Sequence, residues 1–475
     1  MTDMPNDIAI WYQQIPPVAE KGEIIDLMIK LRRKTKKLIH IESQLNNGEI
    51  ISTVIQPKSP TLKFNFIGFS KEKDRVYIYL ENTGEEELKI EKIYCNIEDI
   101  TKNCYIPQPI ILPNSKTLII YSPEAPFQAG KYLVFKVTTD KEVIAQSYTR
   151  VYSHFPIEAF GKDKRAELYF DSETFEIHYP KNKDQLQKLK EEPIFKAIHL
   201  LDDPACLDGY SYSLIGTHAK EIIKRAREIY EIDKIHPTII YACEHTKPYC
   251  YFIYGEITDI FSVDPYEIIY YHNMPEKNAY YVSLAKKASQ PRLLWTIPEA
   301  FTYRGTRFPT AEEERIIVWS EIGEGSKGIW YYVYNQKIGY PANKTLEEEI
   351  KKINWELQRL RDYIVISEPF SLAKADKEKV SCYTLLCGDK GIVLILVNND
   401  HKSFFEEGKD PFIYNQKENF EVKVSIPYWL KIKGIKEIKY QEEKEIEYEI
   451  GIREIIIPID KLEITRQFLI LTERK

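Results

Sequence analysis

Hydrophobic and polar positions alternate along two parts of the chain and follow a helical period between them. Over residues 62–154, short runs such as Val76 to Leu80 alternate apolar and polar residues, and turn sequences such as Asn82 to Gly84 separate them. This period of two is typical of strands with one buried face. It predicts an Ig-like β-sandwich over residues 62–154. Residues 1–61 remain a segment of unclear fold, because their pattern permits a helix or strands.

Strands alternate with helices from residue 155 to residue 370. Strands are expected at 194–201, 238–243, 258–263, 292–297 and 328–334, and helices at 183–192, 218–232, 276–289, after Pro309 and after Thr345. Thr310 with Glu313, and Thr345 with Glu348, have capping-box spacing. An open doubly wound sheet and a closed barrel both fit this rhythm. The Gly-rich phosphate loop that indicates a nucleotide-binding open sheet is missing from the sequence.

The helical pattern stops near Ser371, and alternating runs with a turn at 388–391 predict a second β-sandwich over residues 371–475. The predicted fold class is therefore α/β plus all-β, with a TIM-like (β/α) barrel at 155–370 between two β-sandwich domains. Its first half must be shortened. Only about 40 residues separate Phe155 from Pro193, where three βα units would take about 90 at ~30 residues each.

Composition narrows the class of protein. The 475 residues are 43% hydrophobic and 29% charged, which is typical of large folded domains, and the net charge of −6 gives no reason to expect nucleic acid. The sequence has no apolar run of the roughly 18 residues that a membrane span requires. The first residues lack the basic flank and apolar core of a signal peptide, so we expect a cytoplasmic protein unless a leader was trimmed. Abundant Ile, Lys and Glu, with four Met, suggest a heat-adapted source.

Seven cysteines without CxxC spacing argue against a structural zinc site and against a fully paired secreted framework. Disulfides between Cys95 and Cys104, or between Cys243 and Cys250, stay open. A group of His199, Asp202, Asp203 and His218 lacks the HxH or HExxH spacing of metal sites. The expectation is therefore no metal and no cofactor.

Five short motifs occur in order along residues 193–370, about 40% of the chain. They are Asp202-Asp203-Pro204, Asp264-Pro265-Tyr266, Trp295 to Glu299, Arg307 to Thr310, and Gly325 to Tyr332. In this order they resemble the C-terminal part of the (β/α)8 barrel of bacterial and archaeal glycoside hydrolases. Those families carry Asp-Glu-Pro at strand four, Asp-Pro-Tyr at strand six, and Trp-x-x-Pro followed by Gln or Glu at strand seven. The resemblance implies an acid/base at Asp203 and a nucleophile at Glu299.

Two carboxyls about 5 Å apart can hydrolyse a glycosidic bond with retention, one protonating the leaving oxygen and the other attacking the sugar. Asp203 replaces the family's Glu and is one methylene shorter, so the gap could widen toward inverting distance or activity could be lost. The alternative to a catalytic role for Glu299 is a structural one, an ion pair with Arg304 or Arg307. Glu244, beside His245 at the end of the fifth strand, is then the best substitute nucleophile, and Asp264 is the next.

An oligosaccharide or polysaccharide is the expected partner, held by stacking aromatic rings and by polar groups. The expected substrate-binding residues are Asp202, Glu244, His245, Asp264, Tyr266, Trp295, Tyr303, Arg304 and Trp330. Two functions follow. The first is a glycoside hydrolase that cleaves O-glycosidic bonds with two carboxylates. The second is a non-catalytic carbohydrate-binding or assembly protein on a decayed barrel. Sugar identity and oligomeric state do not follow from the sequence.

Overall fold

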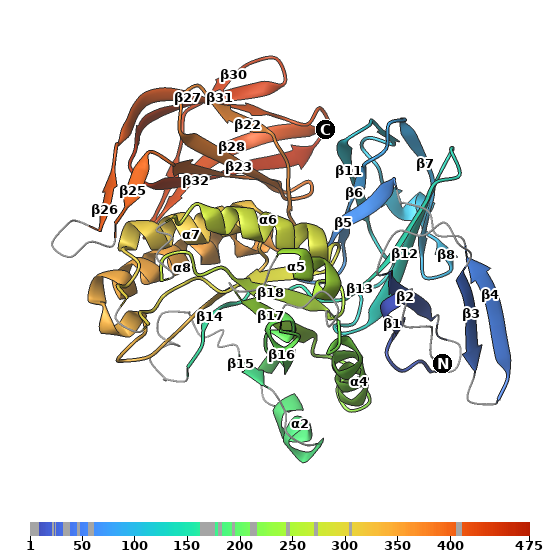
Figure 1. Ribbon diagram of the computed structural model, residues 1–475. Coiled ribbons are helices and arrows are strands. Elements are labelled where there is room, and N and C mark those ends of the chain that lie inside the picture. The colour runs from blue at the N-terminus through green and yellow to red at the C-terminus, as the bar shows by residue number, and fades with distance from the viewer. Residues whose placement is uncertain are drawn as a thin grey trace.

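Seven parallel strands form the central sheet of the protein (Figure 1). The structure is a computed structural model. It describes residues 9–20, 23, 25–31, 39–44, 48–55, 61–161, 176–178, 183–191, 195–209, 216–243, 248–269, 274–303, 306–404 and 411–475. In sheet order the strands are β14 (Ile157–Ala159), β20 (Ile329–Tyr331), β19 (Leu293–Thr296), β18 (Ile260–Asp264), β17 (Thr238–Cys243), β16 (Phe195–Leu201) and β15 (Glu176–His178). Every neighbouring pair is parallel.

The first strand of this sheet, β14, pairs with the last one, β20, as in a barrel that returns on itself. Within the described residues, β14 and β15 end the sheet order, so the sheet is a half-barrel and not a closed ring. In the shortened first half the sequence predicts strands at 155–160, 168–170 and 175–179. β14 lies within the first of these ranges and β15 within the third, while the range 168–170 lies outside the described residues.

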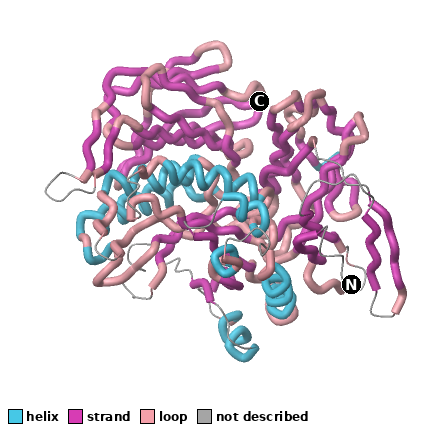
Figure 2. Tube along the Cα trace, viewed as in Figure 1, coloured by secondary structure: helices cyan, strands magenta, loops and turns pink. Residues whose placement is uncertain are grey.

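The helices gather around this sheet, whereas strands dominate the two outer parts of the molecule (Figure 2). Their bounds are α2 (Lys183–Lys190), α3 (Pro204–Leu207), α4 (Ala219–Tyr230), α5 (Pro248–Tyr254), α6 (Lys277–Ser289), α7 (Ala311–Gly323) and α8 (Lys344–Ile364), with 3-10 turns η1 (Thr101–Asn103) and η2 (Tyr340–Ala342). Ile240, Phe261 and Leu294 share one buried cluster with apolar residues of α4, α5 and α6. Alternation along the strands therefore directs Tyr241 and Trp295, one register position away, to the opposite face.

Helices α7 and α8 begin at side-chain caps. The predicted capping box of α7 is confirmed, with Thr310 and Glu313 bonded reciprocally. The predicted cap of α8 is wrong: Asn343, not Thr345, accepts from the backbone N–H of Leu346. Asn is an equally good cap and stands two residues earlier, so Thr345 lies inside the helix. The sequence predicts one apolar stripe along this helix, and all of its residues are buried: Leu346, Ile350, Ile353, Leu357 and Leu360.

The N-terminal part consists of two hairpins and two facing sheets. The hairpins are β1 (Ala9–Ile15) with β2 (Asp26–Leu31), and β3 (Ile39–Gln44) with β4 (Ile50–Ile55). One sheet holds β5 (Leu62–Phe69), β6 (Val76–Asn82), β11 (Ser115–Tyr121) and β9 (Cys104–Tyr105); the other holds β10 (Ile110–Ile111), β7 (Leu88–Cys95), β12 (Tyr132–Thr139), β13 (Ile144–Arg150) and β8 (Glu98–Asp99). The first hairpin docks on the central domain, because Trp11 is buried beside α4 and α5 and donates to the carbonyl of Ile253.

The C-terminal part contains a six-stranded sheet, a four-stranded sheet and a hairpin. The first sheet holds β21 (Glu368–Pro369), β23 (Val380–Leu386), β24 (Gly391–Asn398), β32 (Thr465–Arg474), β28 (Leu430–Lys439) and β29 (Glu442–Glu445). The second holds β22 (Ala373–Ala375), β27 (Lys417–Ser425), β31 (Glu454–Leu462) and β30 (Glu449–Ile450), and the hairpin is β25 (His401–Ser403) with β26 (Phe412–Tyr414). α7 and α8 lie between the central sheet and the six-stranded sheet (Figure 1).

Among the helices of the described residues, none combines the length and the apolar character that a membrane span requires.

Candidate functional site

Polar side chains collect where the central strands end, as expected for parallel strands whose carboxyl ends meet at one edge of a sheet. Asp202 and Asp203 follow β16, Cys243 is the last residue of β17, and Asp264 is the last residue of β18. Cys243 and Asp264 are register partners. Two carboxyl-bearing strand ends therefore flank β17.

Asp202 and Asp264 share two tyrosine neighbours. Burial raises the pKa of Tyr241, and the negative charges of Asp202 and Asp264 raise it further. Tyr332, which follows β20, has its pKa raised by burial and by the same two carboxylates. Burial and the neighbouring Asp203 raise the pKa of Asp202. The two carboxylates thus approach one region from neighbouring sides.

Aromatic rings form the inner face of the half-barrel beneath these acids. Phe160 stacks on Trp330 with ring centroids 3.9 Å apart and planes 10° from parallel. Tyr241 contacts both rings edge-on and stacks on His199 at 4.1 Å. Burial lowers the pKa of His199 to about 4, so its imidazole is neutral at physiological pH. The inner face therefore offers apolar ring surface with polar groups above it.

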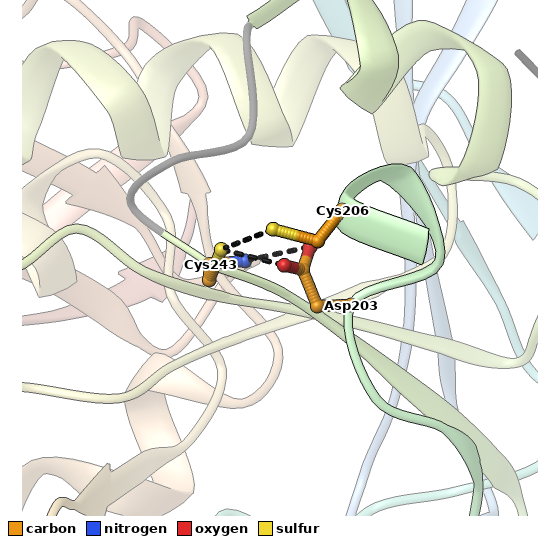
Figure 3. A group of neighbouring side chains, drawn as sticks. All are labelled: Asp203, Cys206 and Cys243. Carbon is orange, nitrogen blue, oxygen red and sulfur yellow. Dashed lines mark hydrogen bonds between the residues drawn. The ribbon is translucent and has the colours of Figure 1, made fainter. Parts of the chain in front are cut away.

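The Asp203 side chain points toward the thiols of Cys206 and Cys243 (Figure 3). The Cys243 thiol donates to Asp203 Oδ2 at 2.7 Å, and the Cys243 backbone N–H donates to Oδ1 at 3.4 Å. The Sγ atoms of Cys206 and Cys243 are 3.6 Å apart. All seven cysteines are present as thiols, so the two disulfides left open by the sequence do not form.

Glu299 lies in a different environment from Asp203. It follows β19, is 0% exposed, and accepts a 2.9 Å hydrogen bond from the backbone N–H of Ile268 at Oε2. Oε1 has no hydrogen-bond partner among the described residues. Burial holds the pKa of Glu299 well above its usual value, and the Glu313 carboxylate raises it further. Burial thus favours the neutral form of this carboxyl, whereas a glycosidase nucleophile must be ionised.

The ion pair considered for Glu299 is made by a neighbour instead. Arg307 forms a bidentate pair with Glu313, with both N–O distances 2.6 Å. Arg304, the other candidate partner, lies outside the described residues, as do Glu244 and His245. The carboxyl of Glu299 thus lies between the backbone that follows β18, at Ile268, and the start of α7.

The aromatic residues that the sequence predicts to bind sugar differ in how deeply they are buried. Trp330 is buried in the ring stack with Phe160. Trp295 is fully buried deeper in the sheet, where its ring contacts Tyr152 and leaves no room for a side chain at Gly328, whose Cβ would meet Trp295 Cδ1 at 2.7 Å. The Tyr266 ring packs edge-on against Phe301, and Tyr303 is exposed.

Tyr241, Tyr332, Phe160, Cys206 and Cys243 were not identified from the sequence. Tyr241 and Phe160 look like ordinary strand residues in a chain that is 13% aromatic. Their positions in the sequence could have placed the two cysteines near Asp203, because Cys206 comes three residues after Asp203 and Cys243 ends the next predicted strand. Together with Asp203, these two cysteines offer one carboxylate oxygen and two sulfur atoms, which are groups that can bind a metal ion.

No family model and no curated protein sequence matches the chain. Solved structures similar to it include a cycloisomaltooligosaccharide glucanotransferase from Paenibacillus sp., with TM-score 0.45 and 7% identity over 86% of this chain and 99% of the other. An α-L-fucosidase isoenzyme 2 from Paenibacillus thiaminolyticus has TM-score 0.40 and 8% identity over 62% and 79%. The archaellum stator protein FlaG from Sulfolobus acidocaldarius has TM-score 0.17 and 16% identity over 19% and 99%.

Glycoside hydrolases thus occur among the structural neighbours. TM-scores below 0.5 at these identities do not assign an activity to this chain.

Proposed function

We propose that the protein is a glycoside hydrolase that cleaves an oligosaccharide at the carboxyl ends of β16 to β20. The observation that supports this proposal is the approach of Asp202 and Asp264 to the same two tyrosines, above a stack of aromatic rings. Glycoside hydrolysis needs two carboxyls on either side of one bond, about 5–10 Å apart. Strands β16 and β18 are separated by one strand, and neighbouring strands lie about 4.8 Å apart, which suits that separation.

The sugar and the aromatic rings are chemically matched. The C–H faces of a pyranose are apolar and stack on aromatic rings, while its hydroxyls need hydrogen-bond partners. Phe160, Trp330 and Tyr332 supply the rings, and Asp202 and Asp264 supply the polar groups. In this proposal one carboxyl protonates the leaving oxygen, and the other attacks the anomeric carbon or activates water.

Substitution of each carboxyl tests the proposal. The wild-type chain is assayed on a panel of aryl glycosides and natural oligosaccharides, and then compared with Asp202→Asn and Asp264→Asn. Each variant keeps the side-chain shape, so turnover is expected to fall by about 10²–10⁴-fold while sugar binding persists. The variant that slows poor leaving groups more than activated ones identifies the acid.

Asp362→Asn is a matched control, because Asp362 is exposed on α8. It should retain wild-type turnover. Wild-type turnover in both Asp202→Asn and Asp264→Asn would contradict the proposal. The same assay distinguishes this pair from the pair predicted from the sequence, Asp203 and Glu299. A loss of about 10²-fold or more in Glu299→Gln would favour the sequence-predicted pair.

Binding without cleavage is a second candidate function, favoured by a cleft of about 870 Å³ between the two outer β-sheet regions and α7. Its lining includes Phe370, Tyr428 and Trp429, together with Lys116 and Glu324. Tyr428 is half exposed, and its hydroxyl donates to the carbonyl of Pro107. The volume lies within the range of ligand-binding clefts.

Tyr428→Ala distinguishes this candidate from the first. If the cleft is the sugar site, Tyr428→Ala weakens oligosaccharide binding measured by calorimetry, and Asp264→Asn leaves it unchanged. If the strand ends are the site, Tyr428→Ala leaves oligosaccharide binding unchanged, while Asp264→Asn lowers turnover.

A further inference from the structure

Three half-buried side chains from two neighbouring strand ends converge on one point (Figure 3). Asp203 precedes α3, Cys206 lies within α3, and Cys243 ends β17. One carboxylate oxygen and two sulfur atoms, one from each residue, all lie within 4.8 Å of one another.

The local fold explains why these groups meet. β16 and β17 are parallel neighbours, so the loop after β16 lies beside the last residue of β17. Asp203 adopts a left-handed conformation with φ of 41° and ψ of 64°, which Asp tolerates better than most residues, and Pro204 then starts α3. Asp203 occupies the N-cap position of α3 without a side-chain capping bond. Its carboxylate is turned to Cys243 instead.

The distances suit ligands of a single tetrahedral ion. Two thiolates bound to one zinc at about 2.3 Å each lie about 3.8 Å apart, and the Sγ atoms of Cys206 and Cys243 are 3.6 Å apart. Asp203 Oδ2 lies nearer to Cys243 Sγ, at 2.7 Å, because the thiol proton bridges them. A metal ion would take the place of that proton, and the oxygen–sulfur distance would open to about 3.5 Å.

We propose that Asp203, Cys206 and Cys243 bind a thiophilic divalent cation, with zinc as the best match. Thiolates favour zinc over magnesium or calcium, and a carboxylate is a common third ligand. Binding displaces two thiol protons into solvent, leaving two thiolates and one carboxylate around the ion. Three protein ligands leave the fourth position to water, the arrangement found in zinc sites that bind or activate a ligand.

The proposed site stands independently of the glycosidase proposal, although the two adjoin each other. Cys243 is the register partner of Asp264, and Asp203 follows Asp202. A bound ion would tie the end of β16 to the end of β17 and so fix the backbone that carries Asp202, one of the two proposed catalytic carboxyls. A disulfide between Cys206 and Cys243 is the competing use of these two thiols.

Metal binding by the full chain tests the inference directly. The purified protein is reduced and stripped of metal under nitrogen, titrated with Co²⁺, and then titrated with Zn²⁺ to displace the Co²⁺. We expect one ion per chain, a thiolate-to-cobalt charge-transfer band, and a melting temperature that rises with Zn²⁺. Cys206→Ser and Cys243→Ser should each weaken the band, because one of its two thiolates is removed, and should weaken Zn²⁺ binding by more than the ~10–100-fold typical of an outer-shell partner. Asp203→Asn should keep the band and weaken Zn²⁺ binding.

Cys382→Ser is the matched control, because Cys382 is a half-buried thiol on β23, outside the central domain. It should bind Co²⁺ and Zn²⁺ as the wild-type chain does. Circular dichroism identifies any variant that has failed to fold, and Cys206→Ala then replaces the failed serine variant. The inference is overturned if the reduced wild-type chain takes up no Co²⁺, or if Cys206→Ser leaves the charge-transfer band at its wild-type intensity. A Cys206–Cys243 disulfide found by mass spectrometry after air exposure, without metal uptake by the reduced chain, also overturns it.

Discussion

The carboxyls at the strand ends and the glutamates on and beside α7 are the same chemical group, but they differ in how far they are buried. Asp203 is hydrogen-bonded to a thiol in a half-buried loop, and the charges of Asp202 and Asp264 raise the pKa of the same two tyrosines. Glu314 and Glu321, by contrast, are 0% exposed on α7, as Glu299 is beside it. Burial raises the pKa of each of these three glutamates.

This difference in burial distinguishes the carboxyls that can take part in catalysis from those that affect the stability of the fold. A carboxyl that exchanges protons with a substrate must be reachable, whereas one sealed behind a helix affects mainly the folding equilibrium. Glu314 shows the sealed case most clearly, because neither of its oxygens has a hydrogen-bond partner among the described residues. We therefore expect the buried glutamates to control how stability depends on pH.

The largest effect expected from this comparison concerns Glu321. Burial raises its pKa from 4.5 to about 8, against the hydrogen bond from Asn278 that lowers it. The folded chain therefore keeps a proton that the unfolded chain loses. This contribution to stability is fully present below pH 4.5 and is lost as the pH rises to 8, on the order of 5 kcal/mol at ~1.4 kcal/mol per pH unit.

Urea unfolding of the wild-type chain and of Glu321→Gln, at intervals from pH 5 to pH 9, measures this slope. Gln cannot ionise, so the free energy of unfolding of Glu321→Gln should fall less steeply with pH. Glu85→Gln is an exposed control and should follow the wild-type curve. Parallel curves for Glu321→Gln and the wild type would show that Glu321 is not protonated in the folded chain.

A smaller effect is expected at Glu313, a buried glutamate on the same helix that has partners. Its carboxylate pairs with Arg307 and accepts from the backbone N–H of Thr310. Glu313→Ala leaves the largely buried Arg307 without its carboxylate, so we expect the free energy of unfolding to fall by about 3 kcal/mol. Urea unfolding at pH 7 gives the value, and a loss below about 1 kcal/mol would mean that solvent replaces this ion pair.

The smallest effect is expected at Thr310, whose hydroxyl accepts from the backbone N–H of Glu313 at 3.2 Å. Thr310→Ala should reduce the free energy of unfolding by about 1 kcal/mol, the usual value of an N-cap. Asn343→Ala, which removes the cap of α8, is a matched variant with the same expected loss. A loss at Thr310 as large as that at Glu313 would indicate that the capping box, not the Arg307 pair, holds this end of α7.

The sequence by itself determined the local elements. Thr310 and Glu313 identified the start of α7, and a stripe from Leu346 to Leu360 identified the buried face of α8. The strands of the central sheet lie close to the predicted ranges. These features depend on residues a few positions apart, whose hydrogen bonds and periodic burial are encoded locally.

Only the tertiary structure decided which strand-end groups meet and which way each side chain points. Glu299 and Asp264 both stand at the end of a predicted strand, yet Glu299 is directed to Ile268 and the start of α7. Cys206 and Cys243 are 37 residues apart and become neighbours only because β16 and β17 pair. Such contacts depend on strand order and on side-chain direction over long sequence separations. Neither is contained in a local pattern of hydrophobic and polar residues.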